Sequence, residues 1–308
     1  MKLNYCRTLF VGFAFFLICA FWQAYDNTIP MILTNKFGMP QTWSGLIMAL
    51  DNILALFMLP LFGAISDRCK SPRGRRTPFI LFGTIVAVAA FVALSFVDQM
   101  QLKNLSQVSA IDDPASLHII YEEEQNAELM SADGEKFVLS ELFTEEEFSR
   151  IRSTITTADG SEITNPDYSV YVVPARQAYA HMVTRQSPGT LILFIVLLLV
   201  ALVSMATFRS PAVALMPDVT IKPLRSKANA IINLMGSAGG IIVLILGMVF
   251  ATGAVKNSMM SYTAYFAVIA GLMLAALAIF MLTVREPRFV HEMHEESRRY
   301  GLETEDDE

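Results

Sequence analysis

Six long apolar stretches divide the chain, and each is about as long as a helix that crosses a bilayer. They are, in chain order, Leu9–Leu33, Thr42–Ile65, Thr77–Val97, Thr190–Phe208, Ala228–Thr252 and Ser261–Val284. About 20 apolar residues in a helix cover the roughly 30 Å of hydrocarbon in a bilayer. The pattern therefore predicts an all-α membrane protein with six transmembrane helices.

A polar segment, residues 98–189, separates the third apolar stretch from the fourth. Alternating residues on both sides of Asp133-Gly134 predict a hairpin. Thr144, with Glu147 three residues later, predicts a capping box at the start of a short helix. The run 168–173, "YSVYVV", has the composition of another strand. We therefore expect a small α+β insertion.

The insertion divides the chain evenly, with three predicted helices on each side. We expect four parts: transmembrane helices 1–3 in residues 1–97, the insertion in 98–189, transmembrane helices 4–6 in 190–284, and a charged tail or linker in 285–308. Many secondary transporters contain inverted three-helix repeats. An insertion at the junction would leave both triplets intact, so the sequence predicts two inverted three-helix repeats.

The chain has 308 residues, of which 54% are hydrophobic, and a formal net charge of -6. Its charged residues are distributed unevenly along the sequence. The short segments on one side of the predicted membrane hold most of the basic residues: Lys2, Arg7, Arg68, Lys70, Arg73, Arg75, Arg76, Lys222, Arg225, Lys227, Arg285 and Arg288. The short loops on the other side hold only Lys36 and Lys256. Cytoplasmic loops carry an excess of Lys and Arg. We therefore expect a multi-pass protein of the cell membrane with both termini in the cytoplasm and the insertion outside.

The loop between the second and third apolar stretches contains a patterned motif, "GAISDRCKSPRGRR". It resembles the signature of the major facilitator superfamily, whose positions are occupied here by Gly63, Asp67, Arg68, Gly74, Arg75 and Arg76. The five residues between Asp-Arg and Gly-Arg-Arg, with "PFI" afterwards, make the loop similar to that of the sucrose–proton symporters and the glycoside–pentoside–hexuronide group. A second match, "RSPAVALMPD" with "RSKANAIINLMGSAGG", places Arg209, Asp218 and Arg225 around the loop between helices 4 and 5.

The resemblance implies that the motif works as a gate. Asp67, at the cytoplasmic end of a helix, can accept charge-assisted hydrogen bonds from Arg75 or Arg76. Such a cluster would lock the inner gate in one state and release it in another. The alternative is a static loop held against anionic lipid headgroups.

Polar residues near the far end of the first apolar stretch predict a binding site. Gln23, Asp26 and Asn27 share one helix face by their i, i+3, i+4 spacing, and Trp22 lies beside them. Hydrogen-bonding groups beside an aromatic ring suit a sugar, which has an apolar face and hydroxyl edges. The alternative for Asp26 is an interfacial residue in water.

A second carboxylate, Asp51, falls deeper within an apolar run and is followed by Asn52. Ionisable residues at membrane depth are costly and mark functional sites, so we expect this pair to couple an ion to transport. A carboxylate in a dry site can take up a proton, and carboxylate and amide oxygens also suit Na⁺. The resemblance implies a carboxylate in helix 4 and an arginine after it, but Leu202 and Val213 stand near those places, which moves the coupling role to Asp51.

These features are typical of the amino-terminal half of a secondary active transporter that works by alternating access. We expect a sugar or glycoside as solute, H⁺ or Na⁺ as coupling ion, membrane lipid around the bundle, and a second six-helix half in a longer chain or a partner chain. The alternative is a membrane-embedded sensor whose insertion binds a ligand. The sequence contains no phosphate loop, nucleophile elbow or paired-cysteine motif. We therefore expect no enzyme activity, no other cofactor, no metal site and no nucleic-acid partner.

Overall fold

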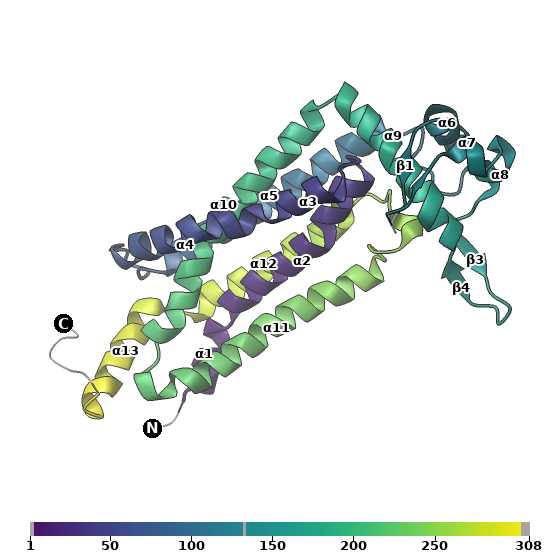
Figure 1. Cartoon of the computed structure of the whole chain (residues 1–308). Coiled ribbons are helices and arrows are strands. Elements are labelled where there is room, and N and C mark those ends of the chain that lie inside the picture. The colour runs from purple at the N-terminus through teal and green to yellow at the C-terminus, as the bar shows by residue number, and fades with distance from the viewer. Residues whose placement is uncertain (1–2, 132–133, 303–308) are drawn as a thin grey trace.

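The computed structural model describes residues 3–131 and 134–302 of the chain. Within them, six helical segments are long and apolar enough to cross a membrane: Tyr5–Asn35, Gln41–Asp67, Thr77–Asn104, Gly189–Asp218, Lys222–Val249 and Thr263–Thr283. The segments run alongside one another, and the insertion forms a lobe at one end (Figure 1). The predicted all-α membrane fold with six transmembrane helices is confirmed.

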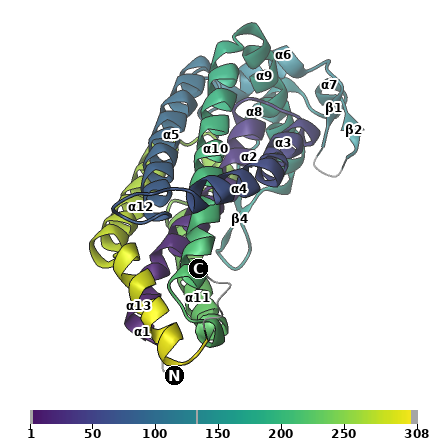
Figure 2. The same cartoon turned by 90° about the vertical axis from the view of Figure 1, so that its left-hand side faces the viewer.

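Some of these segments consist of two helices in sequence. The bundle elements are α1 (Tyr5–Val11), α2 (Phe13–Asn35), α3 (Gln41–Met48), α4 (Leu50–Asp67), α5 (Thr77–Asn104), α10 (Gly189–Asp218), the 3₁₀ helix η2 (Lys222–Leu224), α11 (Arg225–Val249), η3 (Val255–Asn257), α12 (Thr263–Thr283) and α13 (Glu286–Arg299). Helices α1 and α13, the first and last elements of the chain, lie at the end of the bundle opposite the insertion (Figure 1, Figure 2). This arrangement agrees with an even number of membrane crossings.

Helix packing within the bundle follows a pattern that two equivalent triplets would produce. Helix α4 of the second segment packs on α10 of the fourth, and α11 of the fifth packs on α2 of the first. Exchanging the first three segments with the last three converts one contact into the other. The aromatic rings of Phe21, Phe91 and Phe266, with centroids 4.5 Å and 5.2 Å apart, join α2, α5 and α12 in the core. The packing therefore supports the two-repeat organisation.

The insertion is mixed, as the sequence predicts. It contains α6 (Pro114–Glu124), β1 (Leu129–Met130), β2 (Lys136–Phe137), α7 (Leu139–Leu142), α8 (Glu145–Arg150), β3 (Thr154–Thr156), β4 (Glu162–Thr164), the π-helix η1 (Tyr168–Val172) and α9 (Val173–Gln186). Strands β1 and β2 pair antiparallel around the predicted turn, of which positions 132 and 133 lie outside the described residues. The predicted capping box is present, and the N–H and hydroxyl of Thr144 lower the pKa of the Glu147 carboxylate by hydrogen bonding. Hairpin and capping box are both confirmed.

The strand predicted for residues 168–173 is wrong, because this run is helical. Tyr168 and Val172 are both fully buried, whereas Val170 between them is only half-buried; a helix gives this spacing, but a strand would turn Val170 to the same face as the other two. The Tyr168 hydroxyl donates to the carbonyl of Ile111 at 2.7 Å and accepts from Arg176 at 2.9 Å. Tertiary packing thus overrides the strand preference of the β-branched and aromatic residues.

The insertion is fixed to the nearby ends of the bundle helices. Helix α5 continues to Asn104, past the expected boundary at residue 98. Gly38 adopts φ = +62° and packs so closely against the backbone of α9 that a side chain would not fit. Gln177 donates to Asn35 at 2.9 Å, and Gln101 donates to Thr184 at 3.0 Å. The insertion is therefore held to α2 and α5 rather than attached by flexible linkers.

Candidate functional site

A groove of about 370 Å³ lies between α2 and α11. Three of the four residues predicted to bind substrate line it: Trp22, Gln23 and Asp26. The fourth, Asn27, accepts a hydrogen bond from Gln23 Nε2 at 3.1 Å. The i, i+3, i+4 spacing thus brings an indole ring, two amides and a carboxylate to one face of α2.

The opposite wall of the groove comes from α11, and the sequence did not single out its polar residues. Asn233 and Ser237, four positions apart, line the groove and are exposed. Gly240 continues this wall on the next turn of α11 and faces α2, where a side chain at Gly240 would lie 3.7 Å from Gln23 Oε1. The polar and small residues of "NLMGSAGG" follow helical spacing, which is the signal that could have located this wall.

A positive charge reaches the groove from α10. The guanidinium carbon of Arg209 lies 5.6 Å from the centroid of the Trp22 ring, within cation–π range. The prediction placed Arg209 beside the loop between helices 4 and 5, but the residue lies well inside α10, which continues to Asp218. The helix continues because the residues after Arg209 are mostly apolar and the helix packs on α4 and α5 along this length. Asp218 and Arg225 do flank the loop, and Arg225 donates to the carbonyl of Pro217 at 2.9 Å.

The indole N–H of Trp22 is a hydrogen-bond donor that is unpaired among the described residues. Its nitrogen, Nε1, is buried. A buried N–H without a partner costs free energy. A hydroxyl oxygen of a bound ligand is an acceptor that could satisfy it.

The predicted ion-coupling pair lies at the start of α4. Asn52 Nδ2 donates to Asp51 Oδ1 at 3.0 Å. Asp51 is only half-buried and Asn52 is exposed. The dry environment expected for Asp51 is therefore not provided by these six helices, because α4 contacts mainly α10 and leaves its other faces open.

A fully buried carboxylate is that of Asp98, which the sequence prediction assigned to the polar insertion. In the structure it lies in α5 and pairs with Lys36, whose Nζ is 2.5 Å from Asp98 Oδ1. Lys36 also donates to the carbonyl of Met260 at 2.6 Å, and the backbone N–H of Tyr262 donates to Asp98 at 3.1 Å. The ion pair thus ties together the outer ends of α2, α5 and α12. Lys36 is one of only two basic residues in the short loops predicted to lie outside, and this rarity was the signal in the sequence that could have marked it as an ion-pair partner.

At the opposite end of the bundle, the motif residues form an ion-pair cluster. Arg76 bonds to Asp67 and, at 2.9 Å, to Asp218 Oδ2, while Arg75 contacts Asp218 Oδ1 at 3.0 Å. The structure thus joins the two motifs that the resemblance linked. Arg68 is exposed. Gly63 lets α4 approach α10, since a side chain there would lie 3.0 Å from Ser210 Oγ.

Glu286, the first residue of α13, completes this cluster. Its buried carboxylate accepts from the backbone N–H groups of Arg75 at 2.8 Å, Arg76 at 2.9 Å and Thr77 at 2.7 Å. An anion at the amino-terminus of α5 is favoured by the helix dipole and the free N–H groups. Gly74 adopts φ = +105°, and a side chain there would collide with Glu286. We call Asp67, Arg75, Arg76, Asp218 and Glu286 the inner charge cluster.

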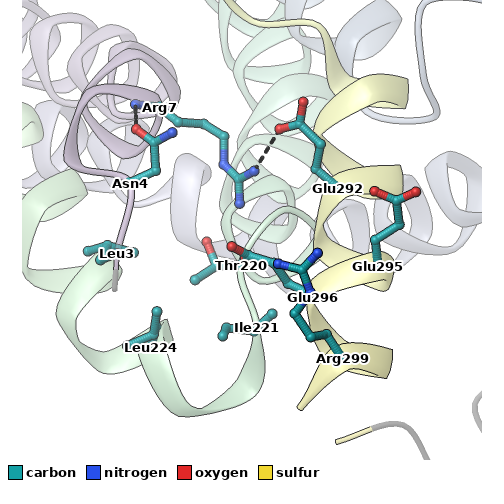
Figure 3. Close-up of a pocket in the computed structure, with 10 residues that line it drawn as sticks. All are labelled: Leu3, Asn4, Arg7, Thr220, Ile221, Leu224, Glu292, Glu295, Glu296 and Arg299. Atoms are coloured by element: carbon teal, nitrogen blue, oxygen red, sulfur yellow. Dashed lines mark hydrogen bonds and ion pairs between the residues drawn. The ribbon is translucent and has the colours of Figure 1, made fainter. Parts of the chain in front are cut away.

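Helix α13, in the charged tail, packs against the bundle, and a small pocket of about 250 Å³ lies between them (Figure 3). Arg7 contacts Glu292 of α13 at 3.2 Å, donates to the carbonyl of Val219 at 2.6 Å, and lies 5.4 Å from the Phe289 ring centroid. Hydrogen bonding from Arg288, with a smaller contribution from Arg7, lowers the pKa of Glu292. Helix α13 is therefore part of the folded unit. Among the described residues, no three His, Cys, Asp or Glu side chains are placed to hold a metal ion.

Comparison with known proteins agrees with this geometry. Residues 10–108, which contain the α2 wall of the groove and the motif of the inner charge cluster, match the family model described as MFS/sugar transport protein. The chain resembles the sugar transporters of the major facilitator superfamily. No solved structure matches it.

Individual relatives are similar over short regions. The sucrose transport protein SUC4 of Arabidopsis thaliana is 42% identical over 51 residues, which cover 17% of this chain and 10% of that protein. The proton-associated sugar transporter A of Mus musculus is 35% identical over 92 residues, 30% of this chain and 12% of the relative. Solute carrier family 45 member 4 of the same species is 35% identical over 75 residues, 23% and 10% of the two chains. The matched regions thus span about a tenth of each relative.

Proposed function

We propose that this chain is the amino-terminal six-helix half of a secondary active transporter for a sugar or glycoside. The observation that carries the proposal is the groove between α2 and α11, where Trp22 lies beside Gln23, Asp26 and Asn233. An aromatic ring can cover the apolar face of a sugar while the amides and carboxylate bind its hydroxyl groups. The names of two relatives, a sucrose transport protein and a sugar transporter, support the same solute class.

A second six-helix half, within a longer chain or on a partner chain, would cover the open side of this groove. Asp26, Asn233 and Ser237 line the groove and are all exposed. Lipid tails cannot satisfy such groups, and leaving them in hydrocarbon would be costly. Helices α4 and α11 also expose apolar side chains beside them, including Leu56, Phe57, Leu234 and Met248. A protein surface with both polar and apolar groups fits this side better than lipid does.

The inner charge cluster supports a rigid-body form of alternating access. Its residues come from the ends of α4, α10 and α13 and from the loop before α5, so the cluster holds four elements together at one end. The Lys36–Asp98 pair does the same at the outer end. We therefore infer that this half moves as one body against the second half, which exposes the groove to each side in turn. Asp51 and Asn52, at the start of α4, would bind H⁺ or Na⁺.

Sugar binding should change the fluorescence of Trp22, because a bound ring would replace water beside the indole. The chain has two tryptophans, and Trp43, exposed on α3 at 58%, provides a matched control. We expect Trp22→Ala to weaken sucrose binding about tenfold, since the lost ring contact and hydrogen bond are worth about 1.5 kcal/mol. Trp43→Ala should leave affinity within about twofold of the parent. Affinity is measured by equilibrium binding of labelled sucrose to the complete transporter, since Trp22→Ala removes the fluorescent group itself, and equal effects of the two substitutions would argue against the groove as the binding site.

Asp67→Asn should slow transport much more than it weakens binding, because the inner charge cluster biases conformation without touching the solute. We expect the maximal uptake rate to fall at least tenfold while the Kd for sugar changes less than about twofold. Lys70→Gln, a substitution at an exposed residue of the same loop, should leave both quantities unchanged. The rate is measured by uptake into proteoliposomes and the Kd by equilibrium binding of labelled sucrose. A proportional loss of rate and affinity would instead place Asp67 in the binding site.

The insertion should lie outside the cell and the basic loops inside it, by the distribution of Lys and Arg. Ser187, at the end of α9, and Ser226, at the start of α11, are both exposed. In a chain whose three cysteines are replaced, Ser187→Cys should react with a membrane-impermeant maleimide on intact cells and Ser226→Cys should react only after permeabilisation. The reverse labelling pattern would invert the orientation.

A further inference from the structure

A groove away from the sugar site lies where the loop before α5 meets the end of α12 and the start of α13. It measures about 560 Å³, and its lining includes Arg73, Arg285, Arg288, Met281 and Val284. Helices α12 and α13 lie together along one edge of the molecule (Figure 2). None of these lining residues contributes to the groove between α2 and α11.

Two of the three arginines of this groove differ from those of the inner charge cluster, while the third, Arg288, pairs with Glu292 at 2.7 Å. Arg75 and Arg76 pair with acidic residues. Arg73 and Arg285 are exposed, and within residues 3–131 and 134–302 neither guanidinium has an ion-pair partner. The nearby Glu286 does not neutralise them, because its carboxylate is buried against the backbone N–H groups ahead of α5. The groove therefore presents unpaired positive charge.

An apolar surface continues from this charge along α12. Met281 and Val284 line the groove, and Leu282 and Ile279 are 80% and 39% exposed on the same helix. Helix α12 ends at Thr283, so the arginines stand at the end of a membrane-spanning helix, at the level of lipid headgroups. Unpaired arginines next to exposed apolar side chains match the layout of a phospholipid, whose phosphate adjoins its acyl chains. Inorganic phosphate would use the arginines alone.

We propose that this groove is a specific site for an anionic phospholipid from the leaflet on the side of the basic loops. The headgroup phosphate binds Arg73 and Arg285, and an acyl chain lies along Met281 and Leu282. A bound lipid would join the loop before α5 to α13, the same two segments that Glu286 connects. The site does not depend on transport, so its test is independent of the proposed function.

Binding is measured by native mass spectrometry of the complete protein with phosphatidylglycerol or phosphatidylcholine of identical acyl chains. We expect phosphatidylglycerol to bind more tightly than phosphatidylcholine. The double variant Arg73→Gln/Arg285→Gln should weaken phosphatidylglycerol binding roughly 25-fold, about fivefold for each arginine. Lys227→Gln, which removes an exposed charge from the first turn of α11, should change it less than twofold. Circular dichroism and size-exclusion profiles like those of the parent would show that the variants are folded.

Three results would overturn the proposal. Equal binding of the two lipids would show that the groove does not select a negative headgroup. Equal losses in the double variant and in Lys227→Gln would indicate unspecific attraction to basic loops. Displacement of phosphatidylglycerol by an equal concentration of inorganic phosphate would identify free phosphate as the ligand, since the acyl-chain contact would then contribute nothing. Weaker binding of phosphatidylglycerol by Leu282→Asn, with the arginines intact, would support the acyl-chain contact.

Discussion

Lys36→Met should lower the free energy of unfolding by about 3–5 kcal/mol, because Asp98 would keep a buried charge with no counter-charge. Both side chains are completely buried, and Lys36 Nζ lies 2.5 Å from Asp98 Oδ1. The same substitution also removes the hydrogen bond to the Met260 carbonyl. The measurement is chemical denaturation in mixed micelles, followed by circular dichroism.

Two controls separate the buried pair from a general effect of charge. Lys256→Met removes an exposed basic residue from an outer loop and should change the free energy of unfolding by less than about 0.5 kcal/mol. The double variant Lys36→Met/Asp98→Leu removes both charges and should recover much of the lost stability, since a buried ion pair can often be replaced by apolar residues. A loss for Lys36→Met no larger than that for Lys256→Met would show that the pair does not hold the helix ends together.

Asp51→Asn should abolish accumulation of sugar against a gradient while preserving exchange across the membrane. The substitution keeps the size of the side chain and removes the charge that would bind the coupling ion. Uptake of labelled sucrose into proteoliposomes, with and without an imposed H⁺ or Na⁺ gradient, measures accumulation. Counterflow in the same vesicles measures exchange.

Two further substitutions make the Asp51 experiment specific. Asp167→Asn neutralises an exposed carboxylate in the insertion and should leave accumulation unchanged. Asp26→Asn, in the groove beside Trp22, should raise the Kd for sucrose without uncoupling transport. If Asp51→Asn accumulates sugar as the parent does, Asp51 is a structural hydrogen-bonding residue and the ion binds elsewhere.

The sequence was sufficient to predict the six transmembrane helices, because each needs only a long apolar run. It was not sufficient for their ends. Helix α5 extends through Asp98 because Lys36, 62 positions away, neutralises that carboxylate inside the protein. Helix α10 extends past Arg209, whose guanidinium lies over Trp22 of another helix. In the sequence, a polar residue is taken as the end of a membrane span unless the residue that pairs with it is known. That pairing residue is visible only in three dimensions.

The residues of the candidate site also differ in whether the sequence alone could place them. Gln23 and Asn27 could be placed on one face from their spacing alone, since both lie on α2. Glu286 could not, because its contacts to Arg75 and Thr77 span more than 200 positions of sequence. The sequence also could not predict the helix at Tyr168–Val172, because the composition of this run favours a strand and its burial is set by neighbouring residues of the insertion. Local periodicity thus located the α2 face, and long-range packing located the rest.

Solute counterflow is the most direct test of the transport function. Proteoliposomes containing the complete transporter are preloaded with unlabelled sucrose and diluted into labelled sucrose. If the groove between α2 and α11 opens to each side in turn, label should enter preloaded vesicles faster than empty ones, and Trp22→Ala should strongly reduce this entry. A membrane-embedded sensor would give a sucrose-dependent change in Trp22 fluorescence while label stayed outside the vesicles, and that result would contradict transport.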